Sequence, residues 1–135
     1  MTRVYVDMVA DLFHAGHVAF LRQARELGDV LVVGIHSDAD VATYKRTPIC
    51  TMEERVAVVG ACRLVDEVIA NAPLSVDEAW LDLHSLDRVV HGDDFDADSL
   101  AASYPGALSR GILATVPYTP GVSTSDLIAR VRLRG

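Results

Sequence analysis

Residues 4–36, VYVDMVADLFHAGHVAFLRQARELGDVLVVGIH, contain the pattern that decides the fold. The β-branched run at residues 4–9 predicts a first strand. An amphipathic segment follows, and its apolar residues recur at helical spacing: Phe20, Leu21, Ala24 and Leu27. We expect a helix over residues 17–27 that ends in a cap at Gly28. Residues 30–35 are almost continuously apolar, as in a central strand buried on both faces. A strand, a helix and a strand in this order predict a βαβ unit with parallel strands.

The rest of the chain repeats this alternation. Capping boxes at residues 51–54 and 75–78 predict two further helices, and we expect the first to carry Val56, Val59 and Cys62 on one face. Further strands are expected at residues 65–69, 88–91 and 112–117. Residues 123–126 can cap a last helix, whereas residues 96–110 show no decisive pattern. We therefore expect an α/β fold. We expect a single domain over residues 1–135, built as a Rossmann-like, doubly wound sheet of five parallel strands with helices on both faces.

The composition excludes several classes of protein. Half of the 135 residues are hydrophobic, which is normal for one globular domain. The formal net charge of -7 argues against nucleic-acid and anionic-membrane partners, which favour basic surfaces. Cys50 and Cys62 show neither metal-binding spacing nor a disulfide framework, and Lys45 is the only lysine. Without a signal-peptide pattern or an apolar run approaching about 18 residues, we expect a cytoplasmic protein.

Polar residues follow the predicted strands, and in a doubly wound sheet ligands bind beyond the carboxyl ends of the strands. These residues are His14, His17, His36, Asp38, Gly92 to Asp94, and Ser123 to Ser125. The most specific group is His14-Ala15-Gly16-His17, at a helix start where free backbone N–H groups favour an anion. Gly16 lets the backbone approach a phosphate, and two imidazoles three residues apart can donate to one phosphate group. The motif therefore predicts a site for negative charge that grows during a reaction.

The HxGH motif in this context resembles the signature of the nucleotidylyltransferase superfamily. Matches to the family follow in order along the chain: residues 21–25, 28–29 and 33–38, Pro48, and residues 51–55, 65–68 and 91–94. Residues 121–127 resemble a GxSTxxL-type phosphate-binding helix start. Together the matches cover nearly the whole chain and are similar to ethanolamine-phosphate and glycerol-phosphate cytidylyltransferases, the former more closely. The resemblance implies transfer of CMP from CTP to a small phosphate or phosphonate acceptor, with release of pyrophosphate.

The resemblance also implies a role for individual residues. His14 and His17 would stabilise charge on the α-phosphate, and Lys45 would reach the phosphates as a mobile point charge. The implied CTP-binding residues are Val9, Ala10, Asp11, Gly16, Arg55, His91, Gly92, Asp93, Asp94, Val122, Ser123 and Thr124. Arg55 would hold phosphate or ribose oxygens, the turn at residues 92–94 would recognise cytosine and ribose, and Asp11 would orient the motif. Mg²⁺ is the expected cofactor. No all-protein metal site is expected, because Mg²⁺ bridges nucleotide phosphates and keeps several waters.

The chain departs from the family pattern in three ways. Met8 stands where the family usually has a glycine, which would be costly if that position required a positive φ. Tyr118 stands where the family tends to carry an arginine, so Arg46 or Arg110 is a candidate for the missing phosphate cation. Ethanolamine-phosphate enzymes resemble two such domains in tandem, whereas this chain has one. We therefore expect a homodimer.

Several alternatives stay open at this stage. The acceptor is ethanolamine phosphate, glycerol phosphate or a phosphonate such as phosphonoformate. An adenylyltransferase of the same superfamily and a non-catalytic nucleotide-binding module are the competing functions. His36 and His91 fit structural roles as well as ligand binding, and Phe20 and Trp80 are expected in the core.

Overall fold

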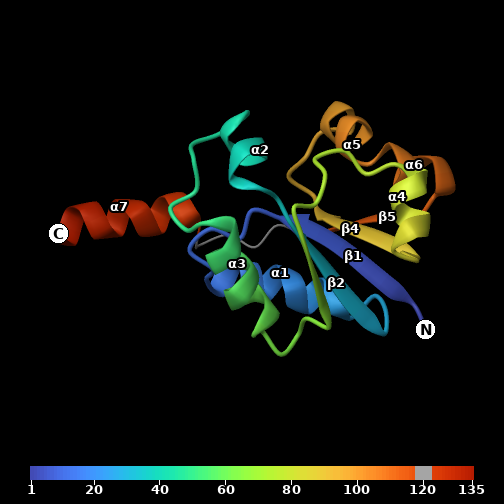
Figure 1. The fold of residues 1–135 in the computed structure, drawn as a ribbon, viewed down its shortest axis with the longest axis horizontal. Helices are drawn as coiled ribbons and strands as arrows, with labels where there is room; N and C mark the ends of the chain where they lie inside the picture. Colours follow the sequence, from blue (N-terminus) through green and yellow to red (C-terminus); the bar gives the residue numbers. More distant parts are fainter. Residues whose placement is uncertain (118–122) are drawn as a thin grey trace.

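The structure is a computed structural model that describes residues 1–117 and 123–135. In this part of the chain, five parallel strands form one sheet: β1 (Arg3–Met8), β2 (Val30–Ile35), β3 (Glu67–Ala70), β4 (Arg88–Gly92) and β5 (Leu113–Val116). Their order in the sheet is β3-β2-β1-β4-β5 (Figure 1). The chain thus builds outward from β1 in one direction and then in the other, which confirms the predicted doubly wound sheet.

Seven helices lie in the described residues. They are α1 (Ala15–Arg25), α2 (Asp38–Ala42), α3 (Met52–Gly60), α4 (Glu78–Leu83), α5 (Ala97–Ser103), α6 (Pro105–Arg110) and α7 (Thr124–Arg134). Helix α7 extends away from the sheet and buries none of its residues (Figure 1). None of the described helices combines the length and the apolar character that crossing a bilayer demands.

The sheet is covered on both faces, and β1 shows why. Alternate residues of a strand point to opposite faces. Val4 and Val6 belong to one core cluster, together with Leu21 of α1 and Val59 of α3. The other cluster contains Tyr5, Leu81 of α4, Ala107 of α6, and Tyr104, which lies between α5 and α6. The prediction of helices on both faces is therefore confirmed.

Several predicted helix ends are wrong. Helix α1 ends in a cap at Glu26, and Gly28 lies beyond it. A Cβ at Gly28 would lie 2.4 Å from Val4 Cγ2 and 2.9 Å from the Thr2 carbonyl oxygen, so the glycine permits a close approach. Helix α3 begins at the predicted capping box but ends at Gly60, and Cys62 packs against the core from beyond the helix.

The second predicted capping box does not form. Helix α4 is capped by Asp77, whose carboxylate accepts a hydrogen bond from the Trp80 N–H at 2.8 Å. Ser75 instead donates its hydroxyl hydrogen to the Ala102 carbonyl at 2.9 Å. Residues 96–110, which had no decisive pattern, form α5 and α6.

Strand β1 is paired unequally with its two neighbours. It pairs with β2 over six register positions but with β4 over only two, Val4 with Arg88 and Tyr5 with Val89. Beyond Tyr5, β1 and β4 share no register pair. This is the point where the strand order reverses, and a ligand site is expected there.

Candidate functional site

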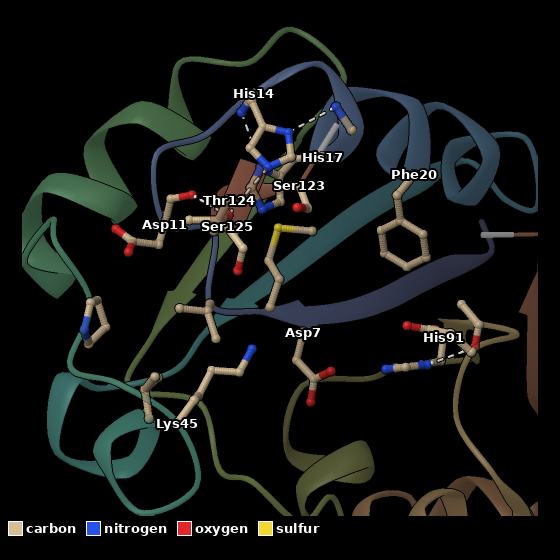
Figure 2. Close-up of a pocket in the computed structure, with 18 of the residues that line it drawn as sticks. Asp7, Asp11, His14, His17, Phe20, Lys45, His91, Ser123, Thr124 and Ser125 are labelled. Atoms are coloured by element: carbon tan, nitrogen blue, oxygen red, sulfur yellow. Dashed lines mark hydrogen bonds between the residues drawn. The ribbon is translucent and has the colours of Figure 1, made fainter. Parts of the chain in front are cut away.

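A cavity of about 390 Å³ lies at the carboxyl ends of β1 and β4. We call it the first cavity. Its lining includes twelve of the predicted site residues: Val9, Ala10, Asp11, His14, Gly16, His17, Lys45, His91, Gly92, Asp94, Ser123 and Thr124. Figure 2 shows His14, His17 and Ser123 to Ser125 on one side of the cavity and Lys45 and Asp7 on the other. Arg55 and Asp93 are not lining residues, and Val122 lies outside the described residues.

His14 and His17 cap helix α1 with their own rings. The backbone N–H of Gly16 donates to His14 Nδ1 at 3.0 Å, and the backbone N–H of His14 donates to His17 Nδ1 at 3.1 Å. A backbone N–H can only donate, so both Nδ1 atoms are unprotonated and each neutral ring carries its proton on Nε2. The two ring centroids are 4.0 Å apart. Two adjacent Nε2–H donors are therefore fixed in orientation at the start of a helix.

Both rings are neutral at pH 7. Burial lowers the pKa of His17 to about 4, with smaller contributions from His14 and Lys45 that Asp11 partly opposes. Burial also lowers the pKa of His14. The motif therefore offers two N–H dipoles and no formal positive charge.

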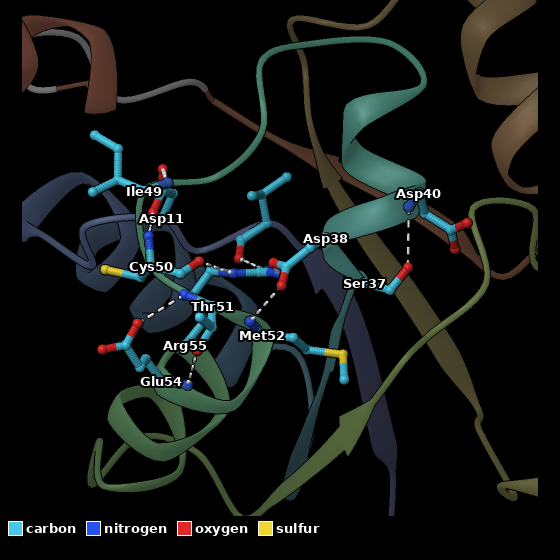
Figure 3. A network of polar contacts seen from close by, with 11 residues as sticks. Asp11, Ser37, Asp38, Asp40, Ile49, Cys50, Thr51, Met52, Glu54 and Arg55 are labelled. Carbon is cyan, nitrogen blue, oxygen red and sulfur yellow. Dashed lines mark hydrogen bonds and ion pairs between the residues drawn. The ribbon is translucent and has the colours of Figure 1, made fainter.

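Asp11 anchors the loop that carries the positively charged Lys45 and Arg46. Its buried carboxylate accepts hydrogen bonds from the backbone N–H groups of Ile49 and Cys50, both at 2.9 Å (Figure 3). The loop between α2 and α3 is thereby tied to the turn before α1, and its Lys45 and Arg46 both line the first cavity. The structure thus shows Asp11 fixing this loop, and its expected role in orienting the HxGH motif stays a prediction.

Only one of the two arginines considered as substitutes for the family arginine is near the site. Arg46 lines the first cavity. Arg110 does not line this cavity and instead pairs with Glu78 at 2.9 Å and with Asp82 at 2.8 Å.

Arg55 lies behind the site. It is 1% exposed, and its guanidinium donates to the Cys50 carbonyl at 3.2 Å, the Val9 carbonyl at 2.6 Å and the Asp38 carboxylate at 2.7 Å (Figure 3). These bonds join the end of β1, the start of α2 and the start of α3. Arg55 was predicted to bind CTP, but the structure does not place it in the lining of the first cavity. Its side chain positions the backbone of Val9, which does line the cavity.

Met8 does not strain the backbone. The turn after β1 has its positive φ values at Ala10 (58°) and Leu12 (49°), whereas Met8 belongs to the strand. A non-glycine residue in the left-handed region costs on the order of 1 kcal/mol or more, and this cost falls on Ala10 and Leu12. The departure at Met8 therefore changes the wall of the cavity, which Met8 lines, and leaves the turn as it is.

The last helix begins at the cavity. Ser123 is the predicted cap of α7 and accepts a hydrogen bond from the Asp126 N–H at 3.1 Å. Thr124 donates its hydroxyl hydrogen to the Asp11 carbonyl at 3.0 Å and lies 3.4 Å from His14 Nε2. The start of α7 therefore sits against the HxGH motif, and its role in phosphate binding stays a prediction.

A second cavity of about 620 Å³ adjoins the first. The two share Asp7, Met8, Val9, Lys45, His91 and Asp94. The other lining residues of the second cavity are His36, Tyr44, Leu74, Phe95, Ser99, Ala102, Ser103 and Tyr104. Aromatic rings thus make up much of its wall.

Asp7 is the functional candidate that sequence reasoning missed. Its side chain is 5% exposed, Tyr104 donates its hydroxyl hydrogen to Oδ1 at 2.5 Å, and His36 Nε2 lies 3.7 Å from Oδ2. Burial raises the pKa of the Asp7 carboxyl, against the opposing effects of His36, Tyr104 and His91. An ionisable side chain within an otherwise apolar strand was the available signal.

Residues 9–130 match a family model described as cytidylyltransferase-like. The chain belongs to this cytidylyltransferase-like family. The ethanolamine-phosphate cytidylyltransferase of Dictyostelium discoideum is 43% identical over 132 residues, which cover 97% of this chain and 37% of that protein. The mouse ethanolamine-phosphate cytidylyltransferase is 40% identical, with 98% and 33% covered. Human choline-phosphate cytidylyltransferase A is 38% identical, with 96% and 36% covered. The chain therefore spans between a third and two fifths of the length of these family members.

Solved structures agree with the family's fold. A lipopolysaccharide core biosynthesis protein from Thermoplasma volcanium is 25% identical with a TM-score of 0.73, over 89% of this chain and 99% of that one. The pantothenate synthetase of Thermus thermophilus has a TM-score of 0.58 at 18% identity, over 93% of this chain and 58% of that one, and supports the fold alone.

Proposed function

We propose that this chain transfers CMP from CTP to the phosphate group of a small acceptor and releases pyrophosphate. The observation that carries the proposal is the pair of Nε2–H donors on His14 and His17, which backbone hydrogen bonds fix beside the first cavity. An oxygen of the acceptor phosphate attacks the α-phosphorus, and the bond from that phosphorus to the pyrophosphate oxygen breaks. Donors held beside the cavity stabilise the charge that accumulates on the phosphate oxygens.

The groups around the pair suit a triphosphate. Lys45 and Arg46 supply positive charge within a chain of net charge -7. The start of α7 adds free backbone N–H groups and hydroxyls next to the HxGH motif. The acceptor phosphate is itself an anionic nucleophile, so positioning and charge stabilisation suffice without a covalent enzyme intermediate.

Mg²⁺ is part of the proposal. No group of three or more His, Cys, Asp or Glu side chains that could hold a metal occurs within residues 1–117 and 123–135. A Mg²⁺ ion that takes its ligands mainly from phosphates and water fits this finding, and when bound it would neutralise phosphate charge. The homodimer stays a prediction.

We further propose an aminoalkyl phosphate such as ethanolamine phosphate as the acceptor. Asp7 supplies a buried carboxyl at the boundary of the two cavities, and the rings of Tyr44, Phe95 and Tyr104 can surround an ammonium group. The relatives named for ethanolamine phosphate and choline phosphate support this choice. Glycerol phosphate offers no positive charge to Asp7, and no relative named above supports a phosphonate.

Pyrophosphate release tests the proposal. The protein is incubated with Mg²⁺, CTP or ATP, and ethanolamine phosphate, glycerol phosphate or phosphonoformate. We expect release with CTP and ethanolamine phosphate, and a decrease of about 10²- to 10³-fold in His14→Ala, which removes one oriented donor. His84→Gln, which changes a histidine outside both cavities, serves as the matched control. Tight CTP binding without transfer to any acceptor would favour a non-catalytic module, and transfer from ATP would favour an adenylyltransferase.

A further inference from the structure

Asp7 and His36 face each other with atoms that can both accept a hydrogen bond. His36 Nδ1 lies 3.2 Å from the Ala72 carbonyl oxygen, which can only accept, so Nδ1 carries a proton. In a neutral ring His36 Nε2 is then unprotonated, and it lies 3.7 Å from Asp7 Oδ2. The two side chains are 8% and 5% exposed. A carboxylate oxygen and a nitrogen lone pair would repel each other in this buried position, so a proton on one of them is favoured.

One proton makes the pair neutral wherever it resides. The two forms are a neutral carboxylic acid beside a neutral imidazole, and a carboxylate beside an imidazolium. Loss of the proton leaves one negative charge in a nearly buried site, which is costly without a cation. The Tyr104 hydroxyl bonds to the other oxygen of Asp7 and stabilises the carboxylate, but it brings no positive charge.

We propose that Asp7 and His36 share one proton in the free protein, and that the ammonium group of the acceptor replaces this proton when it binds. The inference rests on the proposed function and adds a means of selecting the acceptor by its charge. An ammonium group beside Asp7 supplies the positive charge that the proton supplied, and it can donate a hydrogen bond to the freed Nε2 of His36. A neutral acceptor leaves the proton where it is. His36 is thus a positioning residue that acts through Asp7.

The other ionisable groups near Asp7 do not supply the missing charge in the same way. Five such groups come from neighbouring segments: Tyr5, Tyr44, His91, Tyr104 and Asp94, of which Asp94 lines both cavities and brings no positive charge. Burial raises the pKa of all three tyrosines, which stay neutral. His91 places Nδ1 2.8 Å from the Gly92 carbonyl, and its effect lowers the pKa of Asp7 by less than burial raises it. Lys45 lines both cavities, and the proposed mechanism assigns it to the triphosphate.

Calorimetry tests the exchange of proton for ammonium. The full chain is titrated at pH 7.0 with ethanolamine phosphate and with ethyl phosphate, each in three buffers that differ in ionisation enthalpy. Ethyl phosphate has the same phosphate group without the amine, and the same titrations of Asp7→Asn measure the protons that the two phosphates and other residues release. We expect the wild type to release more protons than Asp7→Asn when ethanolamine phosphate binds, and the two proteins to release equal numbers when ethyl phosphate binds. Equal proton release by the two proteins with ethanolamine phosphate, or equal affinity of the wild type for the two compounds, would overturn the inference.

The pH dependence of KM provides a second readout. Below the pKa of the pair, the KM for ethanolamine phosphate should fall about tenfold for each unit of rising pH, relative to that of ethyl phosphate, because binding requires loss of the proton. Tyr104→Phe removes a hydrogen bond that stabilises the carboxylate and should shift this fall to higher pH. A Tyr104→Phe protein that is less stable but has an unmoved profile would contradict the assignment.

The two proposals fail separately. Transfer of CMP to any of the small phosphates supports the proposed function. Transfer to ethanolamine phosphate without the additional proton would leave that function standing and would remove the shared proton. Absence of all transfer, together with release of the additional proton, would remove the proposed function and leave the shared proton standing.

Discussion

Lowering the pH from 7.5 to 5.0 should destabilise this protein through His17 by about 2 kcal/mol. The pKa of His17 is about 4 in the folded chain, mainly because the ring is buried, against an ordinary value of 6.5. Below pH 6.5 the unfolded chain binds a proton that the folded chain does not bind. The free energy of unfolding therefore falls as the pH decreases, until the pH passes the folded value. The full difference in pKa corresponds to about 3 kcal/mol, of which about 2 kcal/mol is lost at pH 5.

Urea unfolding of the wild-type protein and His17→Gln at pH 7.5 and 5.0 measures this effect. Glutamine does not titrate, and its carbonyl oxygen can accept the His14 N–H that His17 Nδ1 accepts in the wild type. We expect the variant to lose about 2 kcal/mol less between the two pH values. Asp7 works in the opposite direction, because its raised pKa makes the folded state bind a proton more readily as the pH falls. Its effect is common to both proteins and cancels. Equal losses in the two proteins would refute the assignment of a buried, neutral His17.

Four further substitutions, one of them a control, test other parts of the structure. Arg55→Met should lower the free energy of unfolding by about 3 kcal/mol in urea titrations, because it leaves buried carbonyl groups without a donor. Arg25→Met, at a partly exposed ion pair with Asp66, should cost less than about 1 kcal/mol, and similar losses in both variants would contradict the role given to Arg55. Tyr5→Phe should raise the thermal midpoint, with a gain of about 1 kcal/mol, because within the described residues the buried Tyr5 hydroxyl has no hydrogen-bond partner; a lower midpoint would reveal one. Lys45→Met should raise the KM for CTP or lower kcat by about tenfold or more, and steady-state kinetics equal to wild type would place Lys45 outside the site.

The sheet was predictable because its signals are local. Strand β2 coincides with the predicted residues 30–35, since burial on both faces requires a continuous apolar run. The Thr51 capping box opens α3 as expected. The same pattern at Ser75 does not open α4, because Asp77 takes the capping position and the Val76 N–H donates to the Ser103 carbonyl. A short motif therefore predicts a helix start only where no tertiary contact competes.

The site was predictable only in part, for the same reason. The position of the HxGH histidines at a helix start arises within four residues and followed from the sequence, whereas their hydrogen bonds to the backbone did not. Asp7 and Tyr104 are 97 positions apart, and nothing local marks them as partners. Arg55 has the charge of a phosphate ligand, but its bonds to Val9 and Asp38 depend on how three distant segments meet. In both cases the contacts join residues far apart in the sequence, so no local pattern predicts them.

The two-position pairing of β1 with β4 also bears on how this scaffold can acquire new substrates. Asp7 and His91 are held in the sheet by their outer neighbours, Gly34 of β2 and Thr115 of β5, and no ladder bond joins them across the gap. Side chains at the gap can therefore be exchanged for others of different size or charge without breaking the hydrogen-bonded framework. Strands that separate early leave room for substrate preference to evolve while the folding of the domain is preserved.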